Sequence, residues 1–338
     1  MDTRAEKSKP VSDVEFIELW RALQSTVRVA ERLGISERAV QSRRRRMEAR
    51  HNIELAINDP RFIGTGGPNE RSRRISAGAA ERARKYERDI PLEVTDGVVV
   101  IGSDAHYWPL IVTTAHQAFC SLVKELQPVA VILNGDILDG ARISRHARIM
   151  WEQQPTLKDE VAAVQDRCAE IERAAGSAQL IRSIGNHDAR FETYLSANAP
   201  DFEEMTGSTL LDYLPRWRAS YAIHINPAQP GWTTVRHRPV SGGIHAAYNS
   251  TLRSGVNYVH GHLHKLQVTP WGDYRGRRFG VDTGTMAEPQ GPQFTYTEAG
   301  PLNWASGFAV LTFHKGALLE PELCVVTGGT AYFRGKSI

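Results

Sequence analysis

The spacing of the hydrophobic residues changes along the chain and divides it into two parts. Before residue 60, apolar residues recur at helical spacing in three stretches. From Gly97 onward they gather in short runs rich in Val and Ile, and each run ends in a polar cluster. Segments with helical potential, at about 110–126 and 157–175, lie between these runs. Because buried strands that alternate with helices form a mainly parallel sheet, this second part predicts an α/β domain.

Three helices are predicted before residue 60, each after a residue that can cap its first turn. The predicted spans and caps are 14–23 after Ser12, 27–33 after Ser25 or Thr26, and 37–50 after Ser36. Ser12 and Glu15 together have the form of a capping box. Gly34 permits a left-handed turn after the second helix, and Ile35 and Val40 are expected to fill a small core.

This arrangement resembles the helix-turn-helix domains of regulators, phage proteins and transposases. The resemblance implies that the third helix enters the major groove of DNA, with base contacts from its first half and phosphate contacts from the arginines behind them. The candidate DNA contacts are Ser36, Arg38, Gln41, Ser42, Arg43, Arg44, Arg45 and Arg46. The alternative is a small helical docking domain whose arginines form a solvated face.

The distribution of charge follows the same division of the chain. Residues 1–90 hold 20 Lys and Arg against 14 Asp and Glu, whereas the remaining 248 residues hold 21 against 24. A basic segment beside a slightly acidic body indicates an anionic partner, for which DNA is our prediction. A Gly- and Pro-containing stretch followed by an arginine-rich polar stretch then predicts a linker. The predicted parts are a helix-turn-helix domain at 1–60, a basic linker at 61–95 and a catalytic domain at 96–338.

Composition excludes several other classes of protein. With 41% hydrophobic and 23% charged residues, the 338-residue chain is neither wholly disordered nor fibrous. It has no apolar run long enough to cross a bilayer and no apolar N-terminal signal, so we expect no membrane partner. Its three cysteines are isolated, which favours a reducing cytoplasm, either of a bacterium or of a phage-infected host cell. The sequence specifies no oligomeric state.

Polar residues capable of binding metal follow the predicted strands. They are Asp104 and His106, Asp136, Asn186, His245, and His262 and His264, and His187 lies next to Asn186. An Asp-x-His or His-x-His pattern on extended backbone places both side chains on one face. Mixed oxygen and imidazole ligands suit Mn²⁺, Fe or Zn²⁺. Seven such ligands are too many for one open site but enough for two ions about 3.5–4 Å apart, bridged by a carboxylate and a hydroxide.

These residues belong to five short sequence motifs, and the order of the motifs resembles that of the calcineurin-like metallophosphoesterase superfamily. The motifs are Asp-x-His at 104–106, Gly-Asp-x-x-Asp at 135–139, Gly-Asn-His-Asp at 185–188, His245, and Gly-His-x-His at 261–264. The resemblance spans about 100–290 and implies a four-layer α-β-β-α sandwich with a dinuclear centre at one edge, for which we expect Mn²⁺. It also implies a catalytic role for His187 as proton donor, positioned by Asp188.

The resemblance further assigns ligands to each ion. By its pattern Asp104, His106 and His264 hold the first metal, Asn186, His245 and His262 hold the second, and Asp136 bridges them. His237 is the main rival to His245, which is preferred because the glycines at 242 and 243 precede it in a strand-to-loop setting. Asp139 is expected to support its loop.

Three basic residues near these motifs are candidates for gripping a substrate phosphate. They are Arg145 and His146, in a Ser-Arg-His triplet similar to phage-encoded members of the superfamily, and Arg190. Salt bridges within the loop are the alternative interpretation.

Three functions are compatible with this sequence. The first is a metal-dependent phosphodiesterase or nuclease acting on DNA, in which a metal-bridging hydroxide attacks phosphorus in line and His187 assists the leaving group. The second is a phosphatase or small-molecule phosphodiesterase whose N-terminal segment docks to a partner. The third is a DNA-binding regulator with a structural metal domain, against which the complete ligand set argues.

Overall fold

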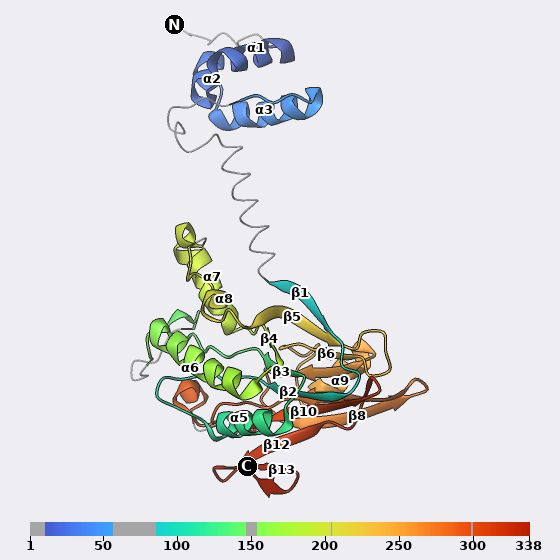
Figure 1. Ribbon diagram of the computed structural model, residues 1–338. Coiled ribbons are helices and arrows are strands. Elements are labelled where there is room, and N and C mark those ends of the chain that lie inside the picture. The colour runs from blue at the N-terminus through green and yellow to red at the C-terminus, as the bar shows by residue number, and fades with distance from the viewer. Residues whose placement is uncertain (1–10, 57–85, 147–153, 204, 299) are drawn as a thin grey trace. The chain divides into compact units, whose positions relative to one another are not determined.

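The computed structural model describes residues 11–56, 86–146, 154–203, 205–298 and 300–338. Contacts within the chain divide it into two units, residues 1–82 and 83–338 (Figure 1). No helix in the described ranges is both long enough and apolar enough to span a membrane.

Within its described residues 11–56, the first unit contains three helices that begin and end close to where the sequence predicted. They are α1 (Asp13–Leu23), α2 (Thr26–Leu33) and α3 (Glu37–His51), with Ser12, Ser25 and Ser36 as their N-caps. Gly34 ends α2 in the left-handed conformation, with φ at 62°. Val40 is buried, as expected, but Ile35 is 38% exposed. The expectation for Ile35 is wrong because Phe16 and Trp20 of α1 fill the core in its place.

The second unit is a mixed α/β fold with one large sheet, as the alternation of strands and helices predicted. The strands along the sheet path are β14 (Lys336–Ser337), β13 (Thr330–Phe333), β12 (Glu322–Thr327), β10 (Gly307–His314), β2 (Gly97–Gly102), β3 (Ala130–Asn134), β4 (Gln179–Ser183), β5 (Arg218–Ile225), β6 (Thr233–Val235), β7 (Asn257–His260), β9 (Gly276–Asp282) and β8 (Gln267–Asp273). Off this path, β1 (Glu87–Leu92) pairs with β5, and β11 (Ala317–Leu318) pairs with β10. Strands β2, β3, β4 and β5 are parallel neighbours.

Helices connect the parallel strands and cover the sheet. The α-helices of this unit are α5 (Thr114–Leu126), α6 (Leu157–Ala175), α7 (Asp188–Asn198), α8 (Leu210–Tyr213) and α9 (Ala246–Ser254). The 3-10 helices are η2 (Ala141–Ile143), η3 (Pro200–Phe202) and η4 (Pro292–Thr297). Helix α5 contacts β2, β10, β12 and β13, whereas α9 contacts β7, β8 and β9. The four-layer sandwich stays a prediction.

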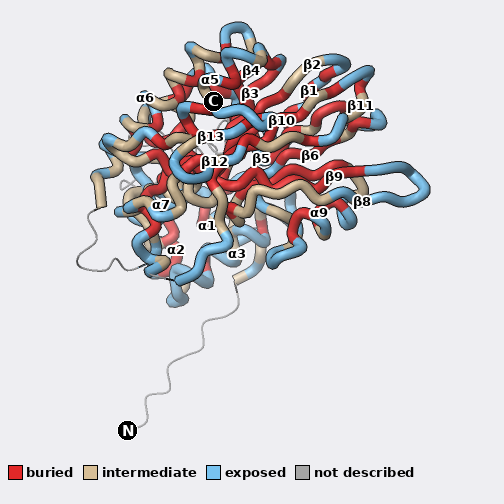
Figure 2. The backbone as a smooth tube through the Cα atoms, turned by 90° about the horizontal axis from the view of Figure 1, so that it is seen from below, coloured by how far each residue is buried: buried red, intermediate tan, exposed pale blue. Residues whose placement is uncertain are grey.

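Alternate residues of the central strands enter two separate cores. Val100 and Val131 pack with α5 and α6 in the first core, whereas Val99 and Ile132 pack in the second, between strands. Because side chains of a strand point alternately to its two faces, continuous Val and Ile runs are what a strand buried on both faces requires. Figure 2 shows the buried central strands in red and the exposed far end of the β8–β9 hairpin in pale blue.

The boundary predicted between linker and catalytic domain is wrong by about one strand. Residues 57–85, which hold most of the predicted linker, lie outside the described residues. Residues 87–92 form β1, which pairs in parallel with β5. Ile90 and Leu92 are both buried in the second core. The alternation of Ile90 with Leu92 is a strand signal that the surrounding charged residues mask.

We expect Ile90→Ala to lower the free energy of unfolding by about 2–5 kcal/mol, because it deletes a fully buried side chain of the second core. Urea unfolding followed by tryptophan fluorescence measures this. Ile244→Ala is the matched control, since Ile244 is 69% exposed, and it should change stability by less than about 0.5 kcal/mol. Equal stability of the two variants would contradict a structural role for β1.

Candidate metal centre

The proposed ligands meet because they follow neighbouring strands. Strands β2, β3 and β4 are parallel, so Asp104, Asp136 and Asn186, each just after one strand, lie at the same edge of the sheet. His262 and His264 follow β7 and reach the same edge. The His262 amide donates a hydrogen bond of 2.9 Å to Asp104 Oδ2, and this bond connects the loop after β7 with the loop after β2.

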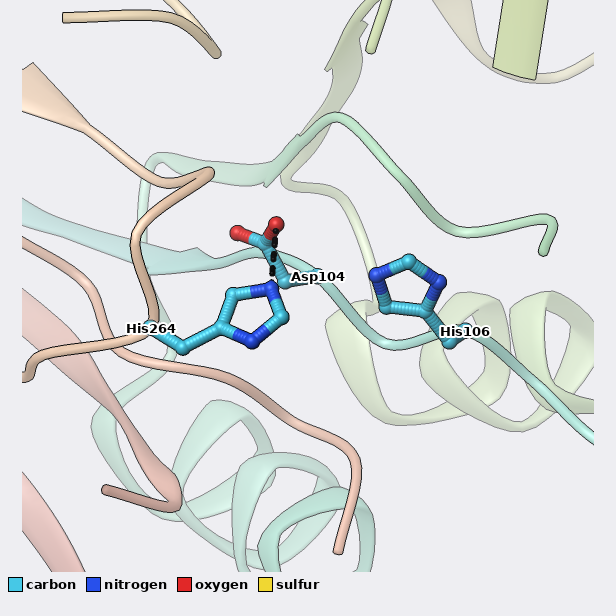
Figure 3. Close-up of side chains that lie close together, drawn as sticks. All are labelled: Asp104, His106 and His264. Carbon is cyan, nitrogen blue, oxygen red and sulfur yellow. Dashed lines mark hydrogen bonds and ion pairs between the residues drawn. The ribbon is translucent and has the colours of Figure 1, made fainter. Parts of the chain in front are cut away.

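The first cluster contains the three residues that the sequence assigned to the first ion. Atoms of Asp104, His106 and His264 that can bind metal lie within 4.8 Å of one another, and all three residues are buried. Figure 3 shows the three side chains turned toward one another, with His264 Nε2 3.0 Å from Asp104 Oδ1. Ring nitrogens His106 Nε2 and His264 Nδ1 are buried and have no hydrogen-bond partner among the described residues.

The second cluster contains Asp136, His237 and His262, whose metal-binding atoms also lie within 4.8 Å of one another. His237 Nε2 is 3.0 Å from Asp136 Oδ2, and the rings of His237 and His262 are 5.2 Å apart. His262 is only half-buried, so this cluster is open to solvent on that side.

The structure brings His237 to this cluster in place of His245. His245 is an exposed residue at the N-terminal end of α9. His237 follows β6, which pairs in parallel with β7, so its side chain lies at the carboxyl edge that the other ligands share. The glycines at 242 and 243 lie in the loop before α9, whereas the prediction placed them between a strand and a loop. The β-branched run Thr233–Val235 was the strand signal that points to His237.

Asn186 and Asp188 lie beside the second cluster in different roles. The side-chain oxygen of Asn186 accepts a hydrogen bond of 3.3 Å from Arg238. The buried carboxylate of Asp188 accepts hydrogen bonds from the backbone amides of residues 136, 137, 138 and 185. Asp188 therefore binds the loop after β3 to the loop after β4, and the described contacts show no hydrogen bond from it to the His187 ring.

Asp139 is the residue that holds His187. The Nδ1 atom of His187 is 3.2 Å from Asp139 Oδ1 and 3.0 Å from the Asp139 backbone oxygen. The same Oδ1 is 2.9 Å from His106 Nδ1. One carboxylate thus orients a proposed metal ligand and the proposed proton donor, whereas the sequence predicted only loop support for it.

Two arginines flank the site. Arg190 lies 3.1 Å from His187 Nε2 and donates to the Asp139 backbone oxygen at 2.9 Å. Arg238, which the sequence pattern did not single out, hydrogen-bonds Asn186 and is exposed. Arg145 and His146 are exposed, and their side chains make no hydrogen bond or ion pair to any other described residue.

The backbone of the site is strained at the ligands themselves. Asp104, His106, Asp136, His262 and His264 all have positive φ, between 39° and 70°. Such conformations are uncommon for residues with a side chain and concentrate at functional sites. Gly261 allows the close approach, because a Cβ atom there would lie 2.3 Å from Asp104 Oδ2.

The buried charges of the site depend on one another. Burial raises the pKa of Asp136, but the positive charge of His237 and the hydrogen bond from it outweigh burial and lower that pKa. Burial lowers the pKa of His237, but Asp136 and Asp104 outweigh it and raise that pKa. Asp104 and Asp136 thus create a negative field that favours a cation, and a divalent ion would compete with the proton on His237. Together with the unpaired ring nitrogens, this field fits bound metal.

A second candidate site lies in the first unit, on one side of α3. Residues spaced three and four apart line a shallow groove there: Arg38, Gln41, Ser42, Arg45, Arg46 and Ala49. All six are exposed. Arg43 and Arg44 face the other way, with their guanidinium carbons 4.8 Å from the Phe16 ring centre and 5.3 Å from that of Trp20. Of the four consecutive arginines, two support the core and two remain on the surface.

No family model matches the chain. It is similar to curated proteins from two mycobacteriophages, both called "Gene 54 protein". The protein of phage L5 is 27% identical over 241 residues, which cover 65% of this chain and 90% of the relative. The protein of phage D29 is 28% identical over 235 residues, covering 63% of this chain and 88% of the relative.

Solved structures similar to the chain include Vps29 of Entamoeba histolytica complexed with zinc, at a TM-score of 0.39 and 13% identity, covering 71% of this chain and 98% of that one. The phosphoesterase YfcE of E. coli matches at a TM-score of 0.33 and 12% identity over 66% of this chain and 97% of that one. A dimetal phosphatase of Danio rerio matches at a TM-score of 0.33 and 11% identity, over 71% of this chain and 97% of that one.

We expect His237→Ala to weaken metal binding at the second cluster by more than about 10- to 100-fold, the usual loss for an outer-shell partner, because it removes a proposed ligand. His245→Ala is the matched control and should bind as much metal as the wild type. After Mn²⁺ reconstitution, elemental analysis should find about two ions per wild-type chain, and Asp136→Ala should lose most of them. Loss of metal from His245→Ala with retention in His237→Ala would reverse the assignment.

Proposed function

We propose that the chain is a dinuclear-metal-dependent phosphodiesterase that acts on DNA. The observation that carries this proposal is the pair of adjacent Asp/His clusters, with His187 beside them and partly open to solvent. The motif order supports the same assignment, because it resembles that of calcineurin-like metallophosphoesterases. The four-layer sandwich of that family and a preference for Mn²⁺ belong to the proposal.

The residues divide between the two ions by position. Asp104, His106 and His264 would hold one ion, and Asp136, His237 and His262, with Asn186 beside them, would hold the other. The second cluster is open to solvent at His262, which suits catalysis because substrate and water need free coordination positions. When bound, the two ions would supply the charge that polarises the phosphate and acidifies the attacking water.

His187 is suited to donate a proton to the leaving oxygen. Its Nδ1 atom is held by Asp139, and its Nε2 atom lies 3.1 Å from Arg190, so a substrate oxygen must take the place of Arg190 there before Nε2 can donate a proton to it. Burial lowers its pKa, but the hydrogen bond to Asp139 and the charge of Asp136 outweigh burial and raise that pKa. The raised pKa favours the protonated ring that a general acid requires at neutral pH.

Arg190 and Arg238 are suited to bind the non-bridging phosphate oxygens. Arg190 contacts Nε2 of His187, and Arg238 contacts Asn186. Guanidinium groups on both sides of a phosphodiester would orient it and compensate its charge. Arg145 and His146 stay candidates for the same role.

DNA is the proposed substrate because of the exposed face of α3. Three arginines, a glutamine and a serine share that face, and their side chains form no hydrogen bond or ion pair with other described residues. Such a face fits phosphate and base contacts in a major groove. The similarity to phage proteins supports the cytoplasm of an infected bacterial cell as the setting of this activity.

We expect His187→Ala to lower turnover of a DNA oligonucleotide by about 10²–10⁴, since it removes the general acid that protonates the alkoxide leaving group, and to affect bis-p-nitrophenyl phosphate less, because p-nitrophenolate leaves without a proton. Metal content should stay near that of the wild type, because His187 is not a proposed ligand. His314→Ala, which changes an exposed histidine paired with Asp96, is the control and should keep full activity. Wild type should be tested with Mn²⁺, Mg²⁺ and Zn²⁺ against bis-p-nitrophenyl phosphate, p-nitrophenyl phosphate, and single- and double-stranded DNA. Hydrolysis of the monoester alone would replace our proposal with a phosphatase.

We expect the Arg45→Ala/Arg46→Ala double variant to bind duplex DNA more weakly and with a flatter dependence on salt. The log–log slope should change by about 0.9 for each DNA phosphate that the variant no longer neutralises. The matched Arg43→Ala/Arg44→Ala variant should destabilise the first unit, since those side chains pack on Phe16 and Trp20. Fluorescence anisotropy at several salt concentrations and thermal unfolding distinguish the two effects. An unchanged slope in the Arg45/Arg46 variant would favour the docking-domain alternative.

A further inference from the structure

A pocket of about 900 Å³ lies beside the first cluster and has no part in the metal assignment. It is formed by the segment from Pro289 to Trp304, which includes η4, and its walls include Phe294 and Trp304. Phe294 is buried, whereas Trp304 is half-buried. The volume is in the range of pockets that hold small organic ligands.

Aromatic rings connect this pocket directly with the metal centre. The ring of Trp304 is 4.5 Å from that of His264, and the ring of Phe294 is 5.1 Å from that of His106. Trp304 and Phe294 also pack edge to face, at 5.0 Å. A ligand stacked on Trp304 would therefore be separated by the Trp304 ring from His264, a proposed metal ligand.

The lining of the pocket includes polar side chains among apolar ones. Gln290, Thr295 and Glu298 line it together with the apolar rings. Nearby, the amide oxygen of Gln293 is buried without a hydrogen-bond partner among the described residues, and a Cβ atom at Gly291 would lie 2.5 Å from it. An aromatic wall combined with amide, hydroxyl and carboxylate groups suits a flat ring with hydrogen-bonding edges.

We propose that this pocket binds a nucleobase of the substrate, stacked on Trp304, while the phosphate next to that base lies at the metal centre. The inference rests on the proposed phosphodiesterase function and specifies its substrate. Bases inside an intact duplex are already stacked and paired, so the pocket admits a base only from a single strand, a frayed end or a free nucleotide. The catalytic unit therefore acts on a phosphodiester whose neighbouring base is unpaired.

The test compares three substrates that share a leaving group. Two are the 5′ and the 3′ p-nitrophenyl phosphate esters of thymidine, and the third is methyl p-nitrophenyl phosphate, which has no base. In the wild type, kcat/KM should favour at least one thymidine ester. In Trp304→Ala that preference should fall by about 5- to 150-fold, mainly through KM, as expected when one stacking partner is removed. Trp304→Phe should retain most of the preference.

Trp271→Ala is the control, because Trp271 is a half-buried tryptophan on β8 outside the pocket, and it should leave the preference unchanged. An equal loss on all three substrates in Trp304→Ala would overturn the proposal and show that Trp304 only supports His264. Titration calorimetry with dTMP and with inorganic phosphate tests the base pocket independently of the phosphodiesterase function. If the wild type hydrolyses no ester, the phosphodiesterase function fails, but tighter binding of dTMP than of phosphate that depends on Trp304 would still support the pocket. Equal binding of the two ligands would overturn it.

Discussion

The structure of the second unit depends on the mutual compensation of charges buried at one edge of its sheet. Three aspartates and five histidines gather there, and nearly all of them are shielded from water. An isolated buried carboxylate is costly, so each needs an imidazole, an amide or a cation close by. Parallel strands β2, β3 and β4 provide that proximity, because their carboxyl ends necessarily meet. The proposed chemistry follows from a packing requirement of the fold.

Loops after the strands carry this arrangement, and their rigidity comes from a few side chains that bind backbone. The Asp188 carboxylate accepts hydrogen bonds from backbone amides of two loops. The Glu160 carboxylate accepts hydrogen bonds from the amides of Gly140 and Ala141, just after Asp139. Burial raises the pKa of Glu160 to about 7, because its carboxylate is removed from water. The left-handed backbone of the ligands persists because such contacts hold it on both sides.

Much of this arrangement could be predicted from the sequence, because strand runs and capping residues act locally. Helix limits in the first unit and the first cluster followed from such signals. The second cluster did not, since the choice between His237 and His245 depends on which segment pairs with β7, and that is a long-range property. The expectation that Ile35 is buried failed for a similar reason, because Phe16 and Trp20 of α1 occupy the core. The role of Asp139 depends on a ring that is 48 residues distant in sequence.

The two faces of α3 differ in what they contact. Arg43 and Arg44 cover aromatic rings of the core, whereas Arg38, Gln41 and Arg45 have no structural partner among the described residues. Substitutions on the outer face should therefore cost little stability, whereas substitutions at Arg43 and Arg44 remove contacts with the aromatic core. Related chains can keep the same three helices while the outer face of α3 differs between them.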